Sequence, residues 1–65
     1  MKHMKRFKLK KIATKIVQLE KIIMNAKDPA VREQAEQEIM QLTIKNNLSL
    51  VDMMEIDEMI QNMLQ

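Results

Sequence analysis

Apolar residues recur every three or four positions through the first part of the chain, and this spacing predicts a long helix. Between residues 9 and 26 they fall at Leu9, Ile12, Ile16, Leu19, Ile23 and Ala26. A second apolar line at Ala13, Val17 and Met24 widens the stripe to roughly half of the helix circumference. That is more than one partner helix requires. We therefore expect a central helix, over about residues 5–26, that contacts two others.

Asp28 followed by Pro29 marks the start of a second helix. Asp is a favoured N-cap acceptor, and Pro is tolerated at the first helical position because its missing N–H would be unpaired there anyway. The expected buried line of this helix is Val31, Ala35, Ile39 and Leu42. Asn46 and Asn47 end it, because Asn tolerates the left-handed conformation at a helix C-terminus. The second helix is thus predicted over 29–45.

A third helix is predicted over 50–64. Ser49 with Asp52 three residues later matches a capping box, although Asp replaces the usual Glu or Gln. Leu48 before the cap and Met53 in the first turns suit a hydrophobic staple. The expected core line is Met53, Ile56, Ile60 and Met63.

These elements predict an all-α fold, a small three-helix bundle formed by residues 1–65 as a single domain. Short connections place consecutive helices antiparallel, so the first and third helices would lie roughly parallel. One alternative is a helical hairpin with the third helix folded across it, and another is a helical hairpin stabilised as a homodimer. With 65 residues and no Cys, stability must come from helix packing.

Charge is unevenly distributed, although the formal net charge is only +2. Residues 1–21 hold eight basic residues and one acid, whereas residues 22–65 hold three basic residues and eight acids. Residues 1–8 are predicted to be a basic, flexible N-terminal arm. We expect the basic end of the first helix to lie near the acids of the third helix, which begin at Asp52.

Candidate catalytic chemistry is sparse, so the sequence predicts a protein that is not an enzyme, with no catalytic residue, no cofactor and no metal site. His3 is the sole His and lies in the predicted arm. Glu55 and Asp57 lie about 200° apart on a helix and do not converge on one ion. No apolar run approaches the roughly 20 residues that span a bilayer, so a cytoplasmic location is expected.

Surplus apolar residues around the second turn point to a protein partner. Met40 and Ile44 lie off the main line of the second helix, and Val51 and Met54 lie off that of the third. A Met-rich patch ringed by Asp52, Glu55 and Glu58 suits contact with another helix. The alternatives are that these residues complete the core or form a homodimer seam. The sequence thus predicts a non-enzymatic interaction module that binds a protein partner through this patch and the basic first helix. Such a module would be an adaptor or inhibitor-like protein of the small bacterial or phage accessory type.

The basic segment 5–15 supports an alternative function, in which the protein binds nucleic acid or the ribosome. Its candidate contacts are Lys5, Arg6, Phe7, Lys8, Lys10, Lys11 and Lys15. Such a segment can neutralise several phosphates, and an aromatic ring can stack on a base. The same charges would also serve as a solubilising face that pairs with the third helix.

Overall fold

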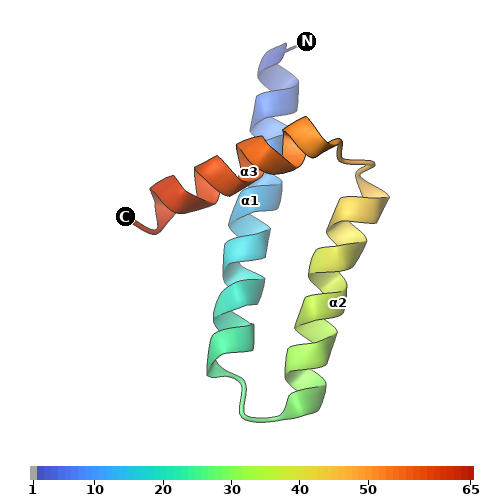
Figure 1. The fold of residues 1–65 in the computed structure, drawn as a ribbon, viewed down its shortest axis with the longest axis vertical. Coiled ribbons are helices and arrows are strands. Elements are labelled where there is room, and N and C mark those ends of the chain that lie inside the picture. The colour runs from blue at the N-terminus through green and yellow to red at the C-terminus, as the bar shows by residue number, and fades with distance from the viewer. Residues whose placement is uncertain (1) are drawn as a thin grey trace.

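Three helices make up the computed structural model, which describes the backbone of residues 2–65 and the side chains of residues 5–65. They are α1 (Lys2–Asn25), α2 (Pro29–Lys45) and α3 (Leu50–Met63), shown in Figure 1. The predicted all-α, three-helix fold is confirmed. The first helix begins three residues earlier than predicted. His3 and the other side chains of residues 1–4 lie outside the described part, and the flexibility of residues 1–8 stays a prediction.

The helices form a hairpin with a crossing helix. α1 and α2 run antiparallel, and α3 crosses the N-terminal half of α1 at a steep angle (Figure 1). α1 contacts both other helices, whereas α2 and α3 do not pack against each other within the described residues. The central role of the first helix is therefore confirmed. The expectation that the first and third helices lie roughly parallel is wrong, and the alternative of a third helix folded across a hairpin describes the arrangement.

The caps around the two turns follow from local side-chain chemistry. The Asp28 Oδ1 atom accepts a hydrogen bond from the Ala30 backbone N–H at 2.9 Å, and Pro29 is the first residue of α2. At the other end of α2, the Asn46 side chain donates to the Leu42 carbonyl at 2.8 Å, and Asn47 has a φ of 51°. This left-handed residue redirects the chain into α3, and both predicted caps are confirmed.

The capping box that starts α3 is also confirmed. The Asp52 backbone N–H donates to the Ser49 Oγ atom at 3.1 Å, and the Ser49 backbone N–H donates to the Asp52 Oδ2 atom at 3.1 Å. Asp therefore replaces Glu or Gln in the box without loss of either hydrogen bond. Leu48, just before the cap, packs against the core.

The core lies where α3 crosses α1. Its buried residues form one cluster: Leu9, Ile12, Ala13, Ile56 and Ile60. Leu19 of α1 and Ala35 of α2 are also buried and line a common hollow in the hairpin. In the middle of each helix, the residues that were predicted to be buried do face inward. No helix within the described residues is both long and apolar enough to cross a membrane.

Four predicted core positions are exposed. Met24 is 84% exposed and Val31 is also exposed, while Met53 and Met63 are each 39% exposed. α3 does not extend to the turn between α1 and α2. Near this turn each of the two helices is therefore covered only on the stripe that faces the other. α3 packs on α1 alone, so the flanks of its apolar face remain open to solvent.

Candidate interaction surfaces

Asp52 joins the start of α3 to α1. The Lys5 Nζ atom lies 3.2 Å from the Asp52 Oδ1 atom, while the Oδ2 atom accepts the Ser49 N–H. The backbone hydrogen bond from Ser49, and then the Lys5 ammonium, hold the pKa of Asp52 below its usual range. The carboxylate is buried and ionised, with both oxygens engaged. The expected proximity of the basic end of α1 to Asp52 is confirmed.

An open groove of about 880 Å³ lies beside this ion pair, between the N-terminal half of α1 and the turn that precedes α3. We call it the basic groove, and its walls are formed by Lys5, Phe7, Lys8, Leu9, Lys11, Asn46, Asn47, Leu48 and Asp52. The Phe7 ring is 62% exposed, and the Lys11 Nζ atom lies 5.0 Å from its centroid, at cation–π distance. The groove therefore combines an aromatic surface with several ammonium groups.

The remaining residues of the predicted nucleic-acid interface lie elsewhere. Arg6 and Lys10 line a hollow of about 300 Å³ next to the C-terminal turns of α3. Lys15 lines a third hollow, of about 200 Å³, between α1 and α2. The crossing helix therefore divides the basic segment. The structure brings only Lys5, Phe7, Lys8 and Lys11 together in one place.

The four residues predicted to bind a protein partner are all exposed. We call Met40, Ile44, Val51 and Met54 the apolar patch. Met40 and Ile44 are four residues apart on α2, and Val51 and Met54 are three apart on α3, so each pair shares one helix face. Since each side chain is at least 60% exposed, these residues do not complete the core of the chain. The patch consists of two exposed pairs, one on each helix that borders the turn 46–49.

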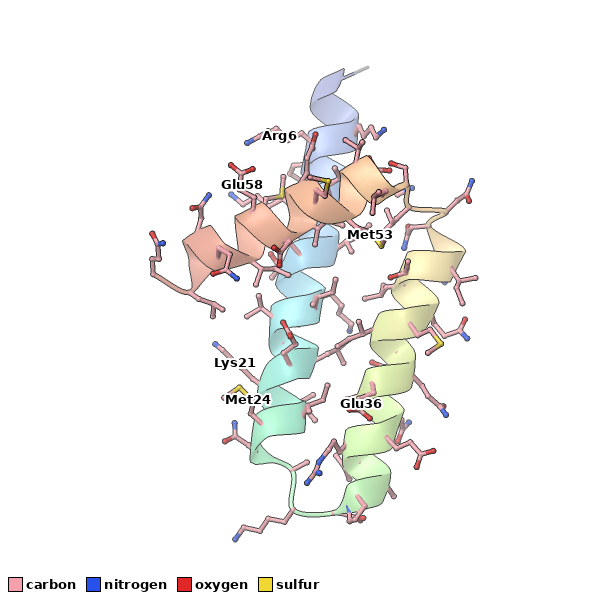
Figure 2. The ribbon with its side chains drawn as sticks, in the orientation of Figure 1. Arg6, Lys21, Met24, Glu36, Met53 and Glu58 are labelled. Carbon is pink, nitrogen blue, oxygen red and sulfur yellow. The ribbon has the colours of Figure 1, made fainter. Side chains whose placement is uncertain are left out.

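The acids predicted to ring this patch are divided in the structure. Asp52 is turned inward and is only 8% exposed, so its predicted place in the ring is wrong. Glu55 and Glu58 are exposed, and Glu58 projects away from α3 in Figure 2. We define the outer face of α3 as Leu50, Val51, Met54, Glu55 and Glu58. The described residues hold no group of three or more His, Cys, Asp or Glu suited to a metal ion.

The basic groove itself was not predicted from the sequence. Its walls come from two segments more than thirty residues apart, and only the tertiary arrangement places them together. The available signal was the opposite charge of the first helix and of the acids that begin at Asp52, which predicted that these two segments lie near each other. In comparisons with known proteins, no family model, no curated protein and no solved structure matches this chain.

Proposed function

We propose that this protein is a non-enzymatic interaction module, an adaptor or inhibitor-like protein, that binds a protein partner through the apolar patch and the basic helix α1. The observation that carries this proposal is the exposure of all four patch side chains on the two helices that border one turn. Burial of such side chains in a complex removes apolar area from water, which stabilises the complex by about 25 cal/mol per Å². Exposed apolar patches rimmed by polar residues are typical of interaction sites.

The chemistry of the patch favours a helical partner. Two of its four side chains are Met, which is flexible and polarizable and therefore adapts to irregular apolar surfaces. Glu55 is next to Met54 in the sequence, and Glu58 lies one helical turn further on. Basic residues of the partner could therefore pair with carboxylates beside the apolar contact. An amphipathic helix with a basic flank meets both requirements.

The test compares two Met→Asp variants in affinity capture from the cells that naturally make the protein. Met54→Asp places a carboxylate in the patch, and we expect it to lower partner recovery at least tenfold. Met24→Asp is the matched control, because Met24 is even more exposed and lies at the opposite end of α1 (Figure 2). It should retain the partner. Recovery of the same proteins by Met54→Asp and wild type, with equal helicity, would contradict the proposal.

Nucleic-acid binding is the second candidate, favoured by one observation. Three ammonium groups and an exposed aromatic ring line the basic groove, a combination that suits phosphates and a stacked base. Two features weaken it. Lys5 is already paired with Asp52, and the remaining basic residues line separate hollows. The groove thus offers a short cationic surface rather than a continuous track for a phosphate backbone.

A salt titration with single-stranded RNA and duplex DNA separates the two candidates. If the protein is a protein-binding module, we expect no complex with RNA or DNA that persists at physiological salt. The nucleic-acid candidate requires a complex that weakens steeply as salt rises and is lost in Lys8→Glu/Lys11→Glu. Such a result would favour nucleic-acid binding over protein binding as the function.

A further inference from the structure

The chain leaves more surface uncovered than a compact protein of its size. Its accessible surface is 5520 Å², about 1,200 Å² more than the roughly 4,300 Å² expected for a compact 7.7 kDa monomer. Its radius of gyration is 12.4 Å, compared with about 11 Å for a typical domain of this length. The surplus exceeds the roughly 800 Å² that each partner contributes to a standard interface. Burial of one further interface would therefore reduce the accessible surface of the chain to about that of a compact monomer of the same mass.

The basic groove specifies the chemistry of its occupant. The exposed Phe7 ring and the half-buried Leu48 supply apolar contact area. Lys8 and Lys11 are exposed, and Lys5 is already paired with Asp52. An occupant must therefore present an apolar ridge flanked by carboxylates.

The outer face of α3 has this composition. Val51, Met54, Glu55 and Glu58 follow the spacing i, i+3, i+4 and i+7, so they share one stripe of the helix. All four are exposed, and α3 carries no basic residue. Phe7, Lys8 and Lys11 likewise share one stripe of α1. Each stripe combines apolar and charged side chains, and the two stripes are opposite in charge.

We propose that the basic groove is occupied by the outer face of α3 from a second copy of this chain, in a two-fold symmetric dimer. This inference rests on the proposed function, whose apolar patch supplies Val51 and Met54. The groove is bordered by Leu48 and Asp52, so the groove and the outer face begin at the same end of α3. A two-fold axis near this end lets each copy offer its α3 to the groove of the other. Contacts between two grooves or between two outer faces would place like charges together.

Nucleic acid fits this location less well. α3 begins at the edge of the groove and carries Asp52, Glu55, Asp57 and Glu58. A polyphosphate backbone that continued past the groove in that direction would meet carboxylates.

The test is a charge exchange followed by sedimentation velocity over a concentration series at low salt. Wild type should associate to a dimer, and association should weaken as salt rises. Lys8→Glu/Lys11→Glu alone and Glu55→Lys/Glu58→Lys alone should each weaken dimerisation at least tenfold, because like charges then meet at both contacts. An equimolar mixture of the two variants should dimerise as wild type does, since every groove again meets a face of opposite charge.

Controls separate this contact from a general effect of charge. Lys21→Glu/Lys27→Glu makes the same change in net charge in the last turns of α1 and in the turn that follows it, and this variant should dimerise like wild type. All substituted residues are exposed, so the helical circular dichroism signal should persist. If a reversed variant loses that signal, the neutral Lys8→Gln/Lys11→Gln replaces it, with an intermediate affinity expected.

Three results would overturn the dimer. These are a wild type that stays monomeric throughout the series, reversed variants that associate normally, and a mixture that stays monomeric. A salt-sensitive complex of monomeric wild type with RNA would assign the groove to nucleic acid instead. None of these results bears on the comparison of Met54→Asp with Met24→Asp, so failure of the dimer and failure of the proposed function are distinguishable.

Discussion

Asp52 has each carboxylate oxygen engaged by a different part of the chain. One oxygen accepts the N–H of Ser49 and closes the cap of α3, and the other lies against the Lys5 ammonium of α1. A buried carboxylate is tolerated only when such partners replace its hydration. The same side chain therefore both starts α3 and ties that start to α1.

This arrangement predicts how the protein responds to acid. The folded-state pKa of Asp52 is lowered by the Ser49 N–H and the Lys5 ammonium, whereas the unfolded chain has an Asp pKa of about 3.9. The unfolded state then binds the proton more readily, so the contribution of Asp52 is complete above that value and is lost as the pH falls through the folded pKa. In thermal melts between about pH 5 and pH 2, Asp52→Asn should show a smaller fall in Tm than wild type.

The matched control for this prediction is Asp57→Asn, which removes an exposed carboxyl from the same helix. It should retain the pH dependence of wild type. An unchanged acid response in Asp52→Asn would mean that neither the Ser49 N–H nor the Lys5 ammonium stabilises the ionised carboxylate in the folded state.

At the scale of elements, α1 is the scaffold on which the other two helices pack. Ala13 is completely buried and belongs to the same cluster as Ile56 and Ile60 of α3. A small side chain lets two helix backbones approach closely where they cross. The position of α3 along α1 thus depends on a residue with almost no side chain of its own.

Ala13→Leu should therefore be destabilising even though it adds apolar volume. The extra atoms have no space at the crossing, and over-packing of this kind costs about 1–3 kcal/mol. Urea denaturation followed by circular dichroism measures the loss. Ala30→Leu makes the same change at an exposed position in the first turn of α2, and its free energy of unfolding should stay within about 0.5 kcal/mol of wild type. Equal stability of Ala13→Leu and wild type would contradict this account of the crossing.

Local signals predicted the helices, and tertiary effects decided their arrangement. The three-and-four spacing and the residues at 28–29, 46–47 and 49–52 act within one or two turns, so they could be interpreted directly from the sequence. The angle of α3 depends on contacts between residues more than forty positions apart, such as Lys5 with Asp52. For the same reason the spacing placed Met24 in the core, although no helix covers it. The exposure of the apolar patch was accessible to pattern analysis, whereas the basic groove was not.

At the scale of the whole molecule, charge separation and open shape are connected. Basic residues dominate α1, acids dominate α3, and the crossing places the two helices in contact while leaving most of these charges exposed. Among the described side chains, the one ion pair between Lys5 and Asp52 neutralises little of this asymmetry. Exposed charges of opposite sign on two faces of one small molecule are the feature from which we propose association between copies.

If the second copy covers the groove, folding and association are linked, and the Tm must depend on protein concentration. Each tenfold rise in concentration adds about 1.4 kcal/mol per dimer to the free energy of unfolding. At about 2.1 cal/mol/K of unfolding entropy per residue, this raises the Tm by roughly 5 °C. Thermal melts of wild type over a hundredfold concentration range should show a total increase of roughly 10 °C, whereas the Tm of Lys8→Glu/Lys11→Glu should depend less on concentration. A concentration-independent Tm in wild type would mean that the open hairpin is stable alone, with its surplus apolar surface free for other partners.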